Sequence, residues 1–323
     1  MGDFANRCQR LFNLDADIAS DVVYLTHGHH NSHVIRILDG YLGNEPGLTS
    51  LYLIESHRPV LIDASTAVSA ERVAMQIRET GIGPDDLAAI ALTHIHADHA
   101  GGAGALAKAF PKATIYVHPK GARHLVDPTR LEASVRALYV DAYDELMGAL
   151  TPIDAGRVQA VSDGERIDLG EGEFLEVLET PGHAKHHLTF IGSEGSAYTG
   201  DAVGIGIGDV SIQPATPPSD FDLDLALASI AKIREADPTQ LMFAHFGRKL
   251  DVDETFDLAE ASLVDWVEVV RAAKAQGLSV EEAVVQLDAN APRAAAPAAS
   301  VMGTRTNVYG VWQYLDQSNE MGK

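Results

Sequence analysis

The stretch Leu92-Thr93-His94-Ile95-His96-Ala97-Asp98-His99-Ala100-Gly101-Gly102 decides the fold of this chain. It follows the apolar run 87–92, which predicts a buried strand, and its paired glycines open a segment of small residues that predicts a helix. Three histidines and one aspartate thus lie at a strand-to-helix turn. Residues i and i+2 at a strand end can face one cation, while the two side chains past the bend can face a second cation beside it.

A metal site is favoured over solvated loop histidines by the setting of this cluster. The chain has 14 histidines, so an isolated pair would be interpreted as part of the surface. The dense spacing, the carboxylate and the preceding apolar strand favour ligands instead. Cys8 is the single cysteine, which excludes an intramolecular disulfide and a thiolate cluster. Imidazole and carboxylate ligands suit zinc, iron or manganese.

Three later segments extend the pattern: Thr180-Pro181-Gly182-His183, Thr199-Gly200-Asp201 and Phe243-Ala244-His245-Phe246-Gly247. In this order, from about Val22 to Gly247, the segments resemble those of the metallo-β-lactamase-fold hydrolase superfamily. The resemblance implies an α+β fold, a four-layer αβ/βα sandwich. It also implies two divalent metal ions, which we expect to be zinc, with iron and manganese as alternatives. By the same resemblance the first ion is bound by His94, His96 and His183, the second by Asp98, His99 and His245, and both by Asp201.

Two further residues are expected to orient the ligands. Asp63 ends the apolar run 60–62, where the family usually has an aspartate near the metals, although a turn aspartate would look the same. His187 matches a position that is often histidine in related sequences. We interpret its neighbour His186 as exposed.

Two other motifs are not assigned to a site. The cluster His27-Gly28-His29-His30-Asn31-Ser32-His33 has no carboxylate and no comparable strand end, so a turn with surface histidines is the simpler interpretation. Gly204-x-Gly206-x-Gly208 opens no convincing helix, so we do not expect a nucleotide site.

The charge of the chain limits its partners. Its 323 residues contain 24 Lys and Arg against 46 Asp and Glu, which gives a formal charge of −22. Such a surface repels phosphate backbones and anionic lipid, and residues 1–20 contain no apolar run of the roughly 20 residues that a membrane span needs. We therefore expect a cytoplasmic enzyme that acts on a small molecule, binds no nucleic acid or membrane, and forms a homodimer.

Two units are predicted along the chain. Hairpins and helices alternate twice, which points to two sheets with helices outside, so residues 1–252 would form the catalytic domain. Residues 253–323 would form a helical extension packed on it, with an apolar stripe at 258, 263, 266, 267 and 270. The Ala- and Pro-rich segment 291–300 is interpreted as a linker. Ser219 followed by Asp222 suggests a capping box before a helix over 223–234.

The resulting hypothesis is a binuclear hydrolase that cleaves an ester, lactone or thioester. A metal-bridging hydroxide would attack the carbonyl, and Asp98 would accept a hydrogen bond from it and pass a proton to the leaving group. Asp201 stands where many β-lactamases carry Cys or Ser, which disfavours antibiotic hydrolysis. Two alternatives stay open: a mononuclear iron dioxygenase acting on persulfides, and a non-catalytic binding module on a relic hydrolase fold.

Overall fold

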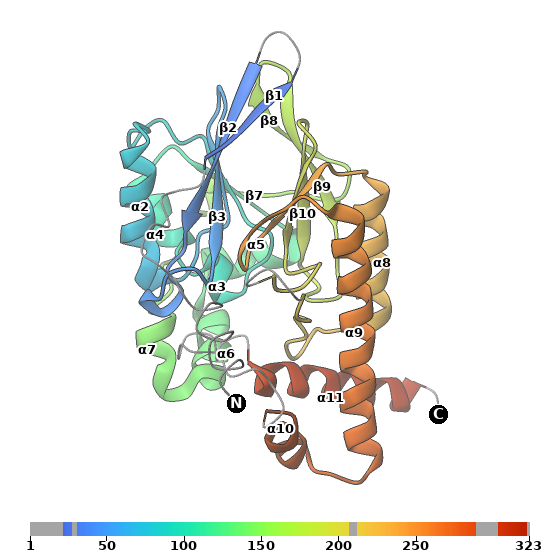
Figure 1. Ribbon diagram of the computed structural model, residues 1–323. Helices are drawn as coiled ribbons and strands as arrows, with labels where there is room; N and C mark the ends of the chain where they lie inside the picture. Colours follow the sequence, from blue (N-terminus) through green and yellow to red (C-terminus); the bar gives the residue numbers. More distant parts are fainter. Residues whose placement is uncertain (1–21, 28–30, 207–211, 289–302, 322–323) are drawn as a thin grey trace, which may run out of the picture.

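The computed structural model describes residues 22–27, 31–206, 212–288 and 303–321. In these residues two β-sheets face each other, and helices cover the outer face of each (Figure 1). The predicted four-layer sandwich is therefore confirmed. The described helices are α2 (Ala70–Glu79), α3 (Ala97–Ala100), α4 (Ala103–Ala109), α5 (Pro119–Val126), α6 (Thr129–Tyr139), α7 (Tyr143–Leu146), α8 (Leu223–Glu235), α9 (Val252–Ala275), α10 (Val280–Asp288) and α11 (Thr304–Met321).

The first sheet changes from antiparallel to parallel along its width. Its order is β1 (Val22–His27), β2 (Asn31–Asp39), β3 (Ser50–Glu55), β4 (Val60–Ile62), β5 (Ala89–Ala91), β6 (Thr114–Val117) and β7 (Val158–Ala160). β1 to β4 pair antiparallel, and β4 to β7 pair parallel. The parallel strands place their carboxyl ends at one edge of the sheet, and the histidine-rich stretch begins there.

The second sheet has the order β13 (Gly247–Lys249), β12 (Gln240–Phe243), β11 (Ser196–Gly200), β10 (Leu188–Gly192), β9 (Glu173–Glu179) and β8 (Arg166–Gly170). Its pairs are antiparallel except for β11 and β12, which run parallel. The carboxyl ends of these two strands therefore also meet at one edge.

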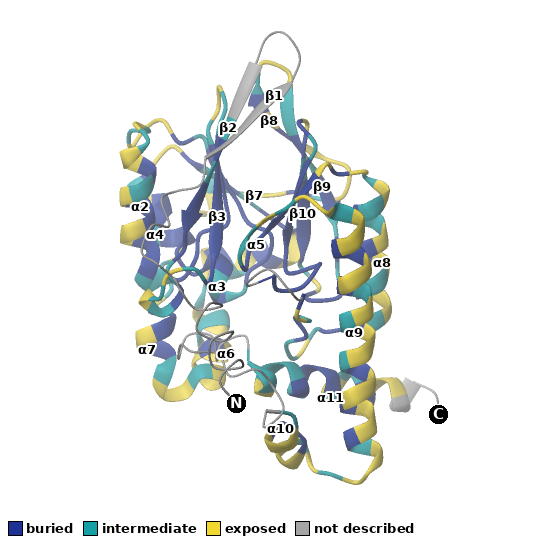
Figure 2. Ribbon diagram, in the orientation of Figure 1, coloured by how far each residue is buried: buried dark blue, intermediate teal, exposed yellow. Residues whose placement is uncertain are grey.

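Alternating side chains explain the layers, because successive residues of a strand point to opposite faces. In β3, Leu51 and Leu53 pack toward α2, α4 and α5, whereas Tyr52 and Ile54 pack between the sheets. In Figure 2 the inner strands of both sheets are buried, and exposed residues lie on the outer helices and the connecting loops. The edge strands β7 and β8 also have exposed residues. A third cluster joins β11 and β12 to α8, α9, α10 and α11, so the carboxyl-terminal helices share a core with the second sheet. The division at residue 252 stays a prediction.

Some local expectations need correction. The cap of α8 is Asp222, whose Oδ1 accepts the Leu225 N–H at 3.0 Å, and not Ser219. The expectations for residues 28–30, Gly208 and the linker 291–300 lie outside the described residues. None of the described helices combines the length and apolarity that crossing a bilayer requires.

Candidate metal centre

The predicted ligands stand at the carboxyl ends of strands from both sheets. His94 comes after β5, Asp201 directly follows β11, and His245 comes two residues after β12. His183 lies in the connection between β9 and β10. Because the parallel strands of each sheet end at one edge, and the two sheets face each other, these segments converge at a single place between the layers.

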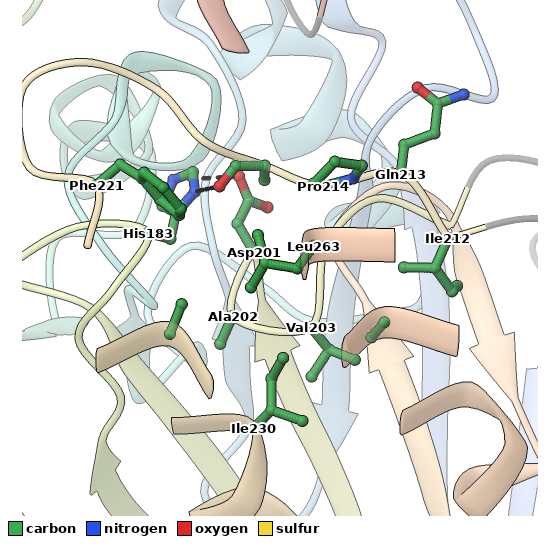
Figure 3. Close-up of a pocket in the computed structure, with 14 residues that line it drawn as sticks. His183, Asp201, Ala202, Val203, Ile212, Gln213, Pro214, Phe221, Ile230 and Leu263 are labelled. Atoms are coloured by element: carbon green, nitrogen blue, oxygen red, sulfur yellow. Dashed lines mark hydrogen bonds and ion pairs between the residues drawn. The ribbon is translucent and has the colours of Figure 1, made fainter. Parts of the chain in front are cut away.

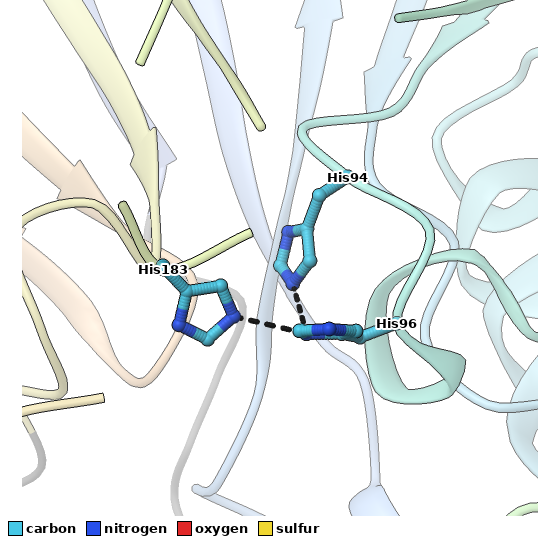
Figure 4. A group of neighbouring side chains, drawn as sticks. All are labelled: His94, His96 and His183. Carbon is cyan, nitrogen blue, oxygen red and sulfur yellow. Dashed lines mark hydrogen bonds between the residues drawn. The ribbon is translucent and has the colours of Figure 1, made fainter. Parts of the chain in front are cut away.

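The first group consists of three imidazoles that point toward one another (Figure 4). His94 Nε2 and His183 Nε2 each lie 2.9 Å from His96 Nδ1. The three ligand atoms lie within 4.8 Å of one another. This arrangement suits one cation bound by three neutral imidazole nitrogens.

The second group consists of Asp98, His99 and His245. His99 Nε2 and His245 Nε2 are 3.3 Å apart, and each lies 3.5 Å from Asp98 Oδ2. Both imidazole rings are buried, whereas Asp98 is only partly covered. A cation here would have two nitrogen ligands and one oxygen ligand.

Asp201 lies between the two groups. Its Oδ2 is 3.4 Å from His183 Nε2, and its Oδ1 is 3.5 Å from His99 Nε2 and 3.6 Å from His245 Nε2. One carboxylate oxygen thus faces each group, which is the arrangement that a carboxylate shared by two cations needs.

Several buried nitrogen and oxygen atoms of the site have lone pairs that no hydrogen-bond donor of the described residues satisfies. Asp201 Oδ1 is buried and has no hydrogen-bond donor among the described residues. His183 Nδ1 is within hydrogen-bonding distance of a backbone carbonyl, so its Nε2 is left with a lone pair. His96 Nδ1 faces this nitrogen and His94 Nε2 at the same distance, and a single proton on His96 cannot serve both. Buried lone pairs without donors are costly, and a bound cation would satisfy them.

Burial and charge divide the histidines into two classes. Burial, reinforced by neighbouring imidazoles, lowers the pKa of His94 and His96 well below its usual range, so both imidazoles are neutral. Burial also opposes protonation of His99 and His245, but the carboxylates of Asp201 and Asp98 outweigh it and raise the pKa of both. The second group is therefore the more strongly anionic environment, where a cation would take the place of the protons on His99 and His245.

Outer contacts set the orientation of the imidazoles. Asp63 Oδ2 accepts a hydrogen bond from His99 Nδ1 at 3.1 Å, and its Oδ1 accepts the Thr93 N–H at 2.8 Å. His245 Nδ1 donates to the Leu48 carbonyl at 2.9 Å. In each case the bond leaves Nε2 directed into the site, as the outer partners of metal-binding histidines do.

His187 acts on the backbone of a predicted ligand. Its Nε2 accepts the Asp201 N–H at 3.1 Å, and its Nδ1 donates to Thr180 Oγ1 at 2.8 Å. Gly200, with φ of +51°, makes this contact possible, because a Cβ there would lie 2.6 Å from His187 Nε2. His187 therefore fixes the turn that carries Asp201.

Two residues near the site were not predicted from the sequence. We expected His186 to be exposed, but it is half-buried. Its ring centroid lies 5.6 Å from that of His96, and burial lowers its pKa to about 4. Tyr139, at the end of α6, packs against the cluster that contains Ala97. Burial, with the carboxylates of Asp98 and Asp201, raises the pKa of Tyr139 far above its usual range, so the phenol stays protonated. The next residue, Val140, has φ of +43°, a strained conformation for a β-branched side chain.

A small cavity lies behind the site, between His183, Asp201 and the helices α8 and α9 (Figure 3). It offers water molecules a volume of about 20 Å³, which is room for roughly one of them. Its other walls are mostly apolar and include Val203, Ile230 and Leu263. It is therefore too small to admit a substrate.

Known proteins share both the sequence pattern and the fold. Residues 44–245 match the family model described as the metallo-beta-lactamase superfamily. The metallo-beta-lactamase fold-containing protein ST1585 of Sulfurisphaera tokodaii is 32% identical over 166 residues, which cover 50% of this chain and 62% of that protein. The match thus spans less than two thirds of that relative.

Two further relatives are named as hydrolases. The N-acyl homoserine lactonase of Bacillus thuringiensis is 24% identical over 256 residues, covering 70% of this chain and 90% of that enzyme. The hydroxyacylglutathione hydrolase of Xanthomonas euvesicatoria pv. vesicatoria is 28% identical over 173 residues, covering 54% of this chain and 52% of that enzyme.

Solved structures show the same architecture. ST1585 from Sulfolobus tokodaii superposes with a TM-score of 0.60 at 23% identity, covering 84% of this chain and 94% of that one. The metallo-beta-lactamase family protein TTHA1429 from Thermus thermophilus gives a TM-score of 0.60 at 19% identity, covering 93% of each chain. At these identities the likeness concerns the fold alone.

Proposed function

Since this chain belongs to the metallo-β-lactamase superfamily, we propose that it is a binuclear metal-dependent hydrolase that cleaves an ester, lactone or thioester of a small molecule. The observation that carries the proposal is the position of Asp201, whose two carboxylate oxygens face different groups of ligands. The names of two relatives, a lactonase and a hydroxyacylglutathione hydrolase, support the choice of bond.

Seven side chains would hold the two cations. His94, His96 and His183 would bind the first, and Asp98, His99 and His245 the second. Asp201, whose two oxygens face different groups, would bind both. When bound, two divalent cations supply a hydroxide nucleophile near neutral pH and polarise the carbonyl under attack. We favour zinc, because this mixture of imidazole and carboxylate suits it, although the same ligands accept iron and manganese.

The protein's own groups would handle protons and charge. Asp98 is the most exposed of the acidic groups at the site, and the charges of His99 and hydrogen bonds from His245 lower its pKa well below the usual range, against the effect of burial. It would accept a hydrogen bond from the attacking water and transfer the proton to the leaving group. Tyr139, which packs against the cluster that contains Ala97 next to Asp98, would donate a hydrogen bond to the oxygen that becomes negative.

The decisive experiment combines metal content with a substrate panel. The protein is stripped with a chelator, reloaded separately with zinc, iron or manganese, and assayed on a thioester, a lactone, a phosphodiester and a β-lactam. The proposal requires about two metal ions per chain and turnover of a carbonyl ester. About one iron per chain, with oxygen consumption on a persulfide and no hydrolysis, would overturn it in favour of a dioxygenase.

Absence of both metal uptake and turnover would instead favour a binding module. The preference for a small-molecule substrate, the homodimer and the cytoplasmic location belong to the same proposal. Analytical ultracentrifugation of the purified protein tests whether it is a homodimer, which would have twice the chain mass of 34.5 kDa.

A further inference from the structure

The segment 213–219, called here the proline loop, connects the metal centre with the carboxyl-terminal helices. Its Ala215 carbonyl accepts a hydrogen bond from His183 Nδ1 at 3.0 Å. Figure 3 shows the neighbouring Pro214 on the same side of the cavity as His183, with Leu263 of α9 nearby. The orientation of one predicted ligand therefore depends on where this loop lies.

The next residue of the loop, Thr216, is fully buried and bound to both α9 and α11. Its backbone N–H donates to Asn307 Oδ1 at 2.7 Å, and its hydroxyl donates to the Asn307 carbonyl at 3.0 Å. The same hydroxyl accepts the indole N–H of Trp266 at 3.1 Å. The hydroxyl of Thr216 thus both donates and accepts a hydrogen bond. Because Thr216 is buried away from water, these hydrogen bonds are stronger than they would be at the surface.

Close backbone contact reinforces the hydrogen bonds. A Cβ at Gly310 of α11 would lie 1.9 Å from the Thr216 carbonyl oxygen and 2.6 Å from the carbonyl carbon of Pro217. Only glycine lets the helix approach the loop so closely. Lys274 of α9 in turn holds α11 in place, through Asp316 at 2.6 Å and the Trp312 carbonyl at 3.3 Å.

We propose that α11 positions a ligand of the first metal group. Asn307, Trp266 and Gly310 fix Thr216, the adjoining Ala215 carbonyl thereby stays on His183 Nδ1, and His183 Nε2 stays directed at His96. The inference rests on the proposed metal centre. It predicts a selective effect, because these contacts bear on His183 and not on the orientation of His245, which the Leu48 carbonyl sets.

The test uses Asn307→Ala, which removes the acceptor of the Thr216 N–H. Its matched control is Gln313→Ala, which removes an exposed amide from the same helix. Stepwise zinc affinities are measured by chelator competition, and His183→Ala and His245→Ala identify which step belongs to which group. We expect the step that His183→Ala abolishes to weaken by roughly 10–100-fold in Asn307→Ala, the usual loss for an outer partner of a ligand. The other step and the control should equal wild type.

A second readout needs no metal. In the stripped protein, hydrogen exchange at the Thr216 amide should be faster in Asn307→Ala than in wild type or Gln313→Ala. Asn307→Asp retains the oxygen acceptor and should restore both slow exchange and affinity. If Asn307→Ala does not fold, Trp266→Phe keeps an aromatic ring, removes only the indole N–H, and should weaken the same step to a smaller extent.

The outcomes separate this inference from the proposed function. Suppose that wild type binds two zinc ions. If Asn307→Ala then leaves the step that His183→Ala abolishes unchanged, or weakens both steps equally, the positioning role alone is overturned. A wild-type protein that takes up no metal would overturn both.

Discussion

The two halves of the metal centre are assembled differently. The first sheet contributes four of the seven proposed ligands from one turn, residues 94–99, whereas the second sheet contributes three ligands from three separate segments. The turn directly follows one buried strand, and Asp63 after the neighbouring strand binds it through the Thr93 N–H and His99 Nδ1. The other three ligands come from segments that tertiary contacts bring together. The second sheet packs against α8, α9 and α11, and His245 also contacts the Leu48 carbonyl, just before β3. The four ligands of the turn are thus close together in sequence and form the local half of the site, whereas the other three lie far apart in sequence and form its dispersed half.

Asp201→Asn should have the largest effect, because Asp201 joins the two halves. Asparagine keeps the size but loses the charge and one of the two oxygens that face the ligand groups. We expect both zinc-binding steps to weaken by more than about 100-fold, beyond the roughly 10–100-fold typical of outer partners. Chelator competition measures both steps. Weakening of only one step would show that Asp201 serves a single cation.

His96→Ala should abolish one binding step and leave the other. The substitution removes a nitrogen that faces both His94 and His183, while the second group keeps its three ligands. Elemental analysis should find about one metal ion per chain, with hydrolysis reduced by more than about 100-fold. The exposed His57 provides the matched control, and His57→Ala should change neither quantity.

Tyr139→Phe tests a residue that belongs to neither half. The substitution removes only the hydroxyl that we assign to the developing negative charge, so metal content should equal wild type. We expect kcat to fall by roughly 100-fold, as when an oxyanion donor is lost, with little change in KM. Tyr309→Phe removes an exposed hydroxyl and serves as the control. A rise in KM at constant kcat would assign Tyr139 to ground-state binding.

Asp63→Asn should have the smallest effect of the four. It replaces the carboxylate that accepts the His99 Nδ1–H and should weaken one binding step by roughly 10–100-fold. Asp63 has φ of +61° and the exposed Asp237 has φ of +50°, so Asp237→Asn controls for the same substitution in left-handed backbone. Equal effects of the two substitutions on the zinc affinities would contradict the orienting role.

The sequence predicts the local half of this site better than the dispersed half. The apolar runs before Asp63 and His94 predict two strands, where each strand ends and which side chain follows it. These features can be predicted because they depend on neighbouring residues only. The motifs around His183, Asp201 and His245 became interpretable only through a family resemblance. Their convergence depends on strand pairing across the second sheet, which no local pattern encodes.

The residues that sequence reasoning missed act across long separations. Tyr139 packs against a cluster that contains Ala97, 42 residues earlier in the chain, and this contact leaves no local signal in the sequence. Asn307 and Gly310 lie beyond the Ala- and Pro-rich segment 291–300, and their role depends on contact with Thr216, 91 residues before Asn307.

The most direct test of the account is a count of cations in three proteins. Wild type, His183→Ala and His245→Ala are stripped, reloaded with zinc, dialysed and examined by elemental analysis and X-ray absorption. We expect about two, one and one zinc ions per chain, with the ion that remains in His245→Ala bound by more imidazoles than the ion in His183→Ala. A wild-type protein with one ion or none, or the same remaining ion in both variants, would contradict a centre built jointly by the two sheets.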